Sequence, residues 1–187
     1  RVLGSRDLDD SGNTENYRIT FANGAGSITV LNGLGVGSAF EKIEIVDEGV
    51  FLTDDDIITR SLEADIAAGR TVLQGPATNG ALFPSGASVI YSYNGADTYT
   101  YNAGDGPLTI IDDAPTTGTN RLEIFGHNST DAVFTRLAEG AEDYLVTLPG
   151  GDQILVVGQF TTETVNGVNE IFFAGDNVTF DDASITF

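Results

Sequence analysis

The sequence predicts an all-β fold: a duplicated, hairpin-rich module of β-roll or β-sandwich type with at most one short helix. Three observations support this prediction. Short runs of Thr, Val, Ile, Tyr and Phe alternate with polar residues, 23 glycines are distributed among these runs, and one block of sequence is present twice in the 187 residues. Alternation with a period of two is the pattern of a half-buried strand, and glycine is common in tight turns.

The duplicated block is easiest to see in its second half. Residues 43–57 read IEIVDEGVFLTDDDI, and residues 171–185 read IFFAGDNVTFDDASI, about 128 positions later. Each copy contains two short apolar strands, an acidic turn with glycine between them, and an Asp pair before a final Ile. A repeated sequence of this length indicates a repeated structural unit.

The first half of the block also matches, because residues 16–34 align with residues 143–160 if the first copy has one extra residue in its glycine-rich turn. The aligned apolar pairs are Tyr17 with Tyr144, Ile19 with Val146, Phe21 with Leu148, Ile28 with Ile154 and Val30 with Val156. Length differences fall in turns, as expected, since a slip of one residue within a strand would turn its buried face outward. We therefore interpret residues 1–73 as the C-terminal part of a first repeat unit, 74–87 as a linker and 88–187 as a second repeat unit.

The elements follow in chain order. The first unit is expected to contain strands at 17–21, 27–31 and 40–46. Leu62, Ile66 and Ala67 then have helical spacing and Gly69 follows them, which predicts one or two helical turns within 54–72. Pro and Gly are frequent in 74–87, which predicts the linker. The strands expected in the second unit are 88–93, 97–101, 108–111, 121–125, 132–137, 144–148, 153–158, 170–173, 177–180 and a short last one ending at 187.

The chain is strongly acidic, with 28 Asp and Glu against 8 Lys and Arg and a net charge of −20. Such a surface repels nucleic-acid phosphates and anionic lipid, because binding to them depends on Lys and Arg. Cations relieve the repulsion among the acids, and Ca²⁺, which prefers carboxylate and carbonyl oxygens, is the expected cofactor. No apolar run reaches the roughly 20 residues that a membrane helix requires.

Catalytic motifs are not apparent in the sequence. Because cysteine is absent, there is no disulfide, thiol nucleophile or cysteine-ligated zinc. The lone histidine, His127, has Ser129 and Asp131 near it, but a triad is defined in space and this composition is typical of a turn. No phosphate-binding glycine loop, zinc helix or dinucleotide fingerprint is present. We therefore expect that the protein is not an enzyme.

Residues 119–185 include the segments TNRLEIFG, DYLVTLPGGDQILVVGQF and VNEIFFAGDNVTFDDASI in this order. This order resembles the module that flanks the calcium-binding nonapeptide repeats of haemolysin-type (RTX) exported bacterial proteins. Residues 94–112 are similar to the family's segment in which a degenerate repeat leads into that module, and residues 6–57 resemble the module again. The resemblance implies bacterial type I secretion, an extracellular or cell-surface location and association with Ca²⁺.

The metal candidates come from the segment that the resemblance places next to calcium. They are Asp97, Asp105, Asp112 and Asp113. In the family, Ca²⁺ binds between successive copies of the nonapeptide G-G-x-G-x-D-x-U-x, whereas this chain has one altered copy in which Ser92 and Tyr93 replace the paired glycines. Leu108 also stands where the family has a second Asp. A roll filled with Ca²⁺ is therefore not expected here, and the alternative role of these acids is to cap turns.

Two functions remain open from the sequence. The first is a non-catalytic structural repeat module of a secreted, calcium-associated, RTX-like bacterial surface protein: an adhesin, surface layer or extracellular filament. Its partners would be neighbouring units or copies that add strands to its exposed edges. The second is a carbohydrate-binding module of a secreted polysaccharide-active enzyme.

The carbohydrate hypothesis depends on four tyrosines. A hairpin turn at 94–96 would place them on one face of two neighbouring strands: Tyr91, Tyr93, Tyr99 and Tyr101. An exposed set of these rings would favour sugar binding. We expect at least half of them to be buried, because large aromatic residues at alternating positions usually belong to the core.

Overall fold

A computed structural model of the chain describes residues 2–7, 16–21, 24–30, 42–46, 49–76, 80–93, 95–112, 118–137, 143–159, 167–181 and 184. It separates into two compact units, Arg1–Arg70 and Thr71–Phe187, which are described one at a time. About half of the described residues are in strands, with one α-helix and two short 3₁₀ helices, η1 (Ser129–Asp131) and η2 (Pro149–Gly151). The predicted strand-rich fold with a single helix is confirmed for the described residues.

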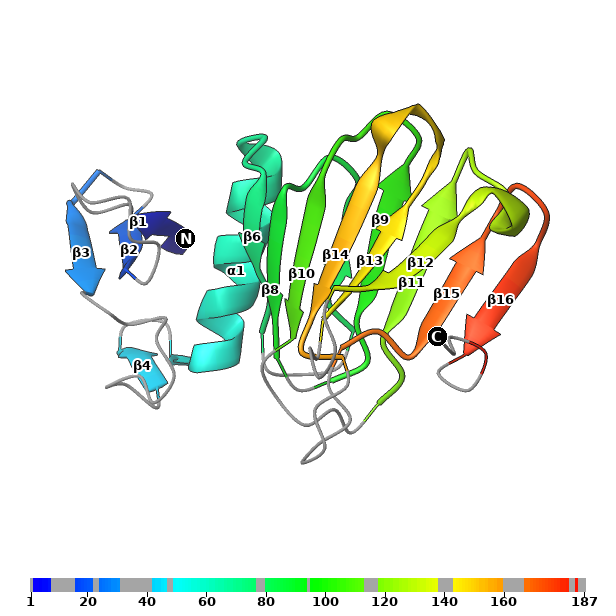
Figure 1. The fold of residues 1–187 in the computed structure, drawn as a ribbon. Coiled ribbons are helices and arrows are strands. Elements are labelled where there is room, and N and C mark those ends of the chain that lie inside the picture. The colour runs from blue at the N-terminus through cyan, green and yellow to red at the C-terminus, as the bar shows by residue number, and fades with distance from the viewer. Residues whose placement is uncertain are drawn as a thin grey trace. The chain divides into compact units, whose positions relative to one another are not determined.

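The first unit contains two antiparallel sheets (Figure 1). One is a meander in the order β1-β2-β3, and the other is a hairpin of β4 and β5. The strands are β1 (Val2–Asp7), β2 (Asn16–Phe21), β3 (Ser27–Val30), β4 (Lys42–Ile45) and β5 (Val50–Thr53). Ile19, Leu52 and Ile57 form the small buried core of this unit, so its stability depends on few side chains.

The helix of the first unit, α1 (Asp54–Ala67), is longer than the one or two turns that the sequence predicts. It begins with a capping box, in which Thr53 Oγ1 accepts a hydrogen bond from Asp56 N and Asp56 Oδ2 accepts one from Thr53 N. These hydrogen bonds lower the pKa of Asp56, the backbone N–H of Thr53 having the largest effect. One carboxylate of the triple-Asp stretch is thus a helix cap.

The second unit is built from parallel strands that alternate between two sheets (Figure 1). One sheet holds β6 (Val72–Gln74), β8 (Val89–Ser92), β10 (Leu108–Asp112) and β14 (Gln153–Val157) as parallel neighbours. The other holds β7 (Leu82–Phe83), β9 (Thr98–Asn102), β11 (Arg121–Phe125) and β15 (Glu170–Phe173) in the same way. Each successive pair of strands is one turn of a two-sheet coil.

Antiparallel strands complete the coil at its C-terminal end. β13 (Tyr144–Thr147) pairs with β14 and with β12 (Val133–Arg136), which gives a six-stranded sheet in the order β12-β13-β14-β10-β8-β6. β16 (Val178–Asp181) pairs with β15, which gives a five-stranded sheet in the order β16-β15-β11-β9-β7. The coil therefore has parallel strands at its centre and antiparallel strands at one end.

The core of the second unit contains the inward-facing residues of both sheets. Ile90, Ile110 and Ile154 of the six-stranded sheet are fully buried, as are Leu122 and Ile171 of the five-stranded sheet. Burial alternates along these strands, as in Leu108–Asp112, where every second residue is buried. The period-two pattern in the sequence thus marks one apolar face on each strand.

The two antiparallel blocks have the same pairing register. Tyr17 lies opposite Val30 and Ile19 opposite Ile28 in the first unit, and the aligned residues Tyr144 and Val146 lie opposite Val156 and Ile154 in the second. The hairpins agree as well, since Ile43 lies opposite Leu52 and Ile171 opposite Phe180. The alignment made from sequence therefore pairs residues that occupy equivalent strand positions.

Two local expectations differ from the structure. The hairpin expected around 94–96 does not form, because β8 and β9 belong to different sheets and each pairs with parallel neighbours. Residues 74–87, expected as a linker, contain the end of β6 and all of β7, which are part of the coil. Both differences have one cause: the chain alternates between sheets instead of folding back on itself.

Candidate functional site

The turns that lead into the five-stranded sheet bring four residues into a row. Ala81, Asp97, Asn120 and Asn169 each directly precede a strand of this sheet. Because Leu82, Thr98, Arg121 and Glu170 are aligned by parallel pairing, the residues before them are aligned too. We call this row, residues 81, 97, 120 and 169, the Asx ladder.

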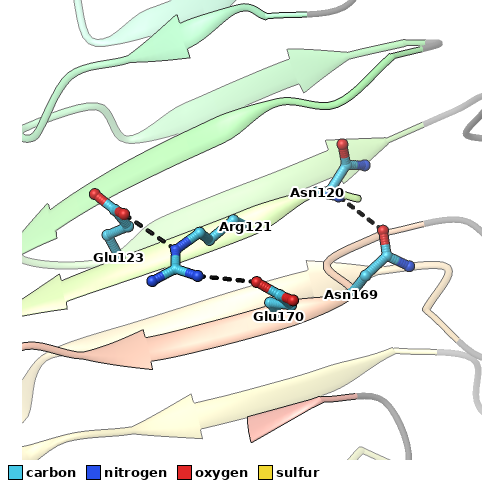
Figure 2. Close-up of polar contacts among 5 residues, drawn as sticks. All are labelled: Asn120, Arg121, Glu123, Asn169 and Glu170. Carbon is cyan, nitrogen blue, oxygen red and sulfur yellow. Dashed lines mark hydrogen bonds and ion pairs between the residues drawn. The ribbon is translucent and has the colours of Figure 1, made fainter. Parts of the chain in front are cut away.

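Hydrogen bonds run along the Asx ladder from one turn of the coil to the next. The backbone N–H of Ala81 donates to Asp97 Oδ1 over 3.2 Å, and that of Asp97 donates to Asn120 Oδ1 over 2.8 Å. Figure 2 shows the next step, in which the backbone N–H of Asn120 donates to Asn169 Oδ1 over 2.8 Å. Each side-chain oxygen therefore accepts a hydrogen bond from a backbone N–H of the preceding turn that has no partner within the sheet.

Asn120 is the centre of this network and is fully buried. Its Nδ2 donates to the carbonyl oxygen of Gly167 over 2.9 Å and to Asp112 Oδ2. Asp112 Oδ2 also accepts a hydrogen bond from the backbone N–H of Gly167 over 3.3 Å. One amide side chain thus joins three consecutive turns of the coil.

Gly167 is required at this point by its backbone and by its surroundings. Its φ is +87°, in the region that favours glycine, and a Cβ there would collide with the side chain of Gln159. Gln159 itself accepts a hydrogen bond from Val168 N over 2.7 Å and donates one to Val168 O over 3.0 Å. The residues just before β15 are therefore held by two side chains, Asp112 at Gly167 and Gln159 at Val168.

Asp97 is the electrostatically unusual member of the ladder. It is 1% exposed, and its Oδ2 has no hydrogen-bond partner among the described residues. Burial raises its pKa to about 7; the hydrogen bond from Ala81 opposes this shift, and the charge of Asp112 adds to it. This carboxyl group therefore changes its protonation state near neutral pH.

Tyr99 lies beside the two carboxylates. Its hydroxyl is 2.6 Å from Ser92 Oγ, and its ring stacks on Phe83 with 5.4 Å between the ring centroids. Burial raises the pKa of Tyr99 well above its usual value, so the hydroxyl stays protonated. The interior at this end of the coil is thus a small polar cluster enclosed by aromatic and aliphatic side chains.

Of the four predicted metal ligands, the structure brings two together. Asp97 and Asp112 lie close enough for their charges to interact. Asp105 caps a turn at the other end of β9, where its Oδ2 accepts a hydrogen bond from Asn102 N over 2.7 Å. Asp113 lies outside the described residues.

The described members of this set do not form a Ca²⁺ site. In the part of the chain that the structure describes, no group of three His, Asp or Glu side chains could hold a metal ion. Ca²⁺ takes six to eight oxygen ligands, whereas both oxygens of Asn120 and one oxygen of each carboxylate are already used in hydrogen bonds. The described arrangement is that of a structural polar core.

The four tyrosines do not share one surface. Tyr99 and Tyr101 are buried, and Tyr101 donates a hydrogen bond to the carbonyl oxygen of Gly106 over 2.6 Å. Tyr91 is 36% exposed on β8, and the half-buried Tyr93 accepts a hydrogen bond from Gln74 Nε2 over 3.1 Å. Half of the set is therefore buried, as expected, and the rings do not form the platform that the carbohydrate hypothesis requires.

A second polar cluster lies at the opposite end of the coil strands. The carboxylate of Asp152, just before β14, accepts a hydrogen bond from Gly104 N over 2.7 Å and lies 3.1 Å from His127 Nε2. These contacts, with the Gly104 N–H as the largest, lower the pKa of Asp152 despite its burial. Ser129 instead bonds the exposed Asp176 through its hydroxyl, over 2.6 Å. The neighbours His127 and Ser129 therefore have different carboxylate partners and form no triad.

The outer face of the five-stranded sheet carries a surface ion-pair network. Arg121 on β11 contacts Glu123 Oε1 over 3.0 Å and Glu170 Oε2 over 2.9 Å, as Figure 2 shows. Its guanidinium carbon is also 4.8 Å from the ring centroid of Phe172. These partners lie on β11 and β15, so the network joins two turns on the outside of the coil.

Sequence reasoning missed the most connected residues of the site, Asn120, Asn169 and Asp152. A signal for the first two was present, since an Asx residue directly precedes each of the strands β9, β11 and β15.

Comparisons of the chain with protein-family models, curated proteins and solved structures found no match. No helix among the described residues is long and apolar enough to cross a membrane. In the second unit, fold and site together define a two-sheet coil of mainly parallel strands whose turns are joined by internal polar ladders.

Proposed function

We propose that the chain is a non-catalytic structural repeat module of a secreted, RTX-like bacterial surface protein, such as an adhesin, surface layer or extracellular filament. The observation that carries this proposal is the same antiparallel block in both units, with equal strand order and equal register. In the second unit this block continues a parallel coil of β-roll type. A chain that repeats such a unit is built to extend along one axis.

The use of the polar side chains supports a structural role. Asn120, Asp152 and His127 are buried and bond groups on neighbouring turns of the coil. A catalytic centre instead needs reactive groups directed at a space where substrate can bind. These three side chains are used in joining turns of the coil.

Composition supports the proposed location outside the cell. A chain with no cysteine and a net charge of −20 folds without disulfides and remains dispersed where salt and divalent cations are abundant. The resemblance to RTX proteins adds type I secretion to this proposal. Association with Ca²⁺ would require ligands outside the described residues, because the described acids do not form a site.

Immunogold electron microscopy of intact source cells, with an antibody against this chain, tests the proposal. We expect gold on the cell surface or along extracellular fibres, and gold confined to the cell interior would overturn the proposal. A glycan array tests the alternative of carbohydrate binding. Binding to a glycan that is lost in Tyr91→Ala, the variant of the exposed tyrosine, would favour a carbohydrate-binding module instead.

A further inference from the structure

The two antiparallel blocks differ in what lies beside them. We define the first block as β1 to β5 and the second block as β12 to β16. In the second block, β14 pairs in parallel with β10, and β15 pairs in parallel with β11. The equivalent strands of the first block, β3 and β4, are edge strands of their sheets among the described residues. The first block thus has the strands of a coil end without the coil.

Burial of equivalent residues differs in the same way. Ile154 and Ile171 of the second block are fully buried, in a core that they share with β10 and β11. Their equivalents in the first block are Ile28, which is 50% exposed, and Ile43, which is only partly buried. The apolar face that the coil covers in the second block is therefore only partly covered on the first, where Ile19 and Leu52 are buried with Ile57 but Ile28 is exposed.

An apolar groove marks this partly covered face. It has a volume of about 280 Å³ and is lined by side chains from the meander and from the β4-β5 hairpin, among them Ile19, Phe21, Ile28, Ile43, Ile45 and Leu52. In the second block, the residues equivalent to Ile28 and Ile43 point into the coil interior, where Ile110 and Leu122 are fully buried. The groove thus lies where the interior of a coil would continue.

We propose that this face of the first block binds the last turn of another two-sheet parallel coil, of the kind formed by β10 and β11. One strand of that turn pairs in parallel with β3, another pairs with β4, and their inward aliphatic side chains fill the groove. The occupant is inferred from continuity with the β10–β14 and β11–β15 pairings of the second block. This inference rests on the proposed role as a repeat module, since it describes how one unit joins the next.

A second copy of this chain is a poorer occupant than a preceding coil. The other edge strands of the parallel sheets are β6 and β7, which are the first strands of their sheets. Like β3 and β4, they lack a preceding parallel neighbour. In a parallel coil, each strand pairs on one side with the strand of the turn before and on the other side with the strand of the turn after. Among the described residues, the open sides of β3, β4, β6 and β7 all face the turn before, so two copies of this chain cannot pair in parallel through them.

Thiol labelling tests the proposal directly, because the chain has no cysteine. The variant Ile28→Cys is prepared in the 187-residue chain and in an extended chain that carries a second copy of residues 71–131 directly before Val2. This junction reproduces the spacing of the second block, in which Arg136 is paired as Arg6 is in the first. The matched control is Val133→Cys, at a position that is 59% exposed on β12.

We expect the added coil to slow labelling at position 28 by roughly tenfold or more and to leave labelling at position 133 unchanged. Equal rates at position 28 in the two chains would overturn the proposal. Hydrogen exchange on β8 to β10 verifies that the extended chain is folded, and slow exchange on β3 and β4 provides an independent readout. The substitutions Ile110→Asp and Leu122→Asp in the added copy alone should restore fast labelling.

Two further results separate the alternatives. If labelling at position 28 of the unextended chain slows as protein concentration rises, a second copy occupies the groove and the proposed occupant is wrong. The labelling result does not depend on cellular location. A failure of this inference with gold on extracellular fibres would therefore leave the proposed function intact with another type of joint.

Discussion

Asn120 Nδ2 donates a hydrogen bond to Asp112 Oδ2, and both side chains are buried, although the first precedes a strand of one sheet and the second ends a strand of the other. This contact closes the turn between β10 and β11 from the inside. Because Asn120 also bonds Asp97 and Gly167, the same amide fixes the turns before and after. Of the side chains at this end of the coil, Asn120 therefore links the most turns.

We predict that Asn120→Ala lowers the free energy of unfolding by about 4 kcal/mol, since it leaves Asp97 N, Gly167 O and Asp112 Oδ2 each without a buried partner. The adjacent variant Arg121→Ala removes surface ion pairs and the contact with the Phe172 ring, and should cost about 1 kcal/mol or less. Urea unfolding followed by circular dichroism measures both. Equal losses in the two variants would contradict the assigned role of Asn120.

The raised pKa of Asp97 predicts how stability varies with pH. The folded chain holds this proton up to about pH 7, whereas the ordinary value is 3.8. The stabilisation from the protonated form is therefore complete below about pH 4 and is lost as pH rises toward 7. Asp97→Asn keeps an acceptor for Ala81 N and removes the charge, so it should stabilise the chain at pH 8 by on the order of 1–3 kcal/mol.

Thermal unfolding at a series of pH values between 4 and 8 checks this prediction. The difference between Asp97→Asn and the unmodified chain should grow with pH across this range. Asp105→Asn is the matched control, because Asp105 caps a surface turn at the other end of β9. A difference that is constant with pH would show that Asp97 does not titrate between 4 and 8.

Asp152→Ala is predicted to destabilise the chain by about 2 kcal/mol at pH 7, because Gly104 N and His127 lose a buried charged acceptor. The pKa of Asp152 is lowered in the fold, so its contribution is present above its ordinary value of 3.8 and is lost as pH falls below it. The exposed Asp176→Ala is the control and should cost less. A loss at pH 7 that is no larger than the control's would contradict the prediction.

Divalent cations are predicted to act on this chain only by screening. Ca²⁺ and Mg²⁺ at equal ionic strength should raise the melting temperature equally, because each reduces the repulsion of a net charge of −20. Differential scanning calorimetry with each ion, and with EDTA, measures this. A rise specific to Ca²⁺ would place a calcium site in residues such as Asp113, outside those described.

Most of the strands of the second unit were predictable, because β-branched and aromatic residues occur there in short runs bounded by turn residues. Alternation identified the regions of β8 to β16 within a residue or two. It missed β6 and β7, which have three and two residues, because a strand so short has no measurable period. The repeat alignment was a stronger guide, since it placed Ile19 and Val146 at equivalent strand positions.

Partner choice between strands was not predictable from local pattern. The run from Tyr91 to Tyr101 has the same alternation in a hairpin as in a coil, and only pairings with residues far along the chain, such as Ile110 with Val156, distinguish the two. For the same reason, two acids of the candidate site were predicted and its central amide, Asn120, was not. Asp97 and Asp112 were identified by type, but the amide that binds them lies on a later turn.

The parallel coil has a mechanical consequence. Each of its strands bonds only to the turn before and the turn after, so tension along the coil axis loads one pair of strands at a time. Under such a load the coil would lengthen in steps of one turn, and the buried amide at position 120 would yield together with the strands beside it. A chain of these units would absorb a sudden pull gradually, as a series of small ruptures.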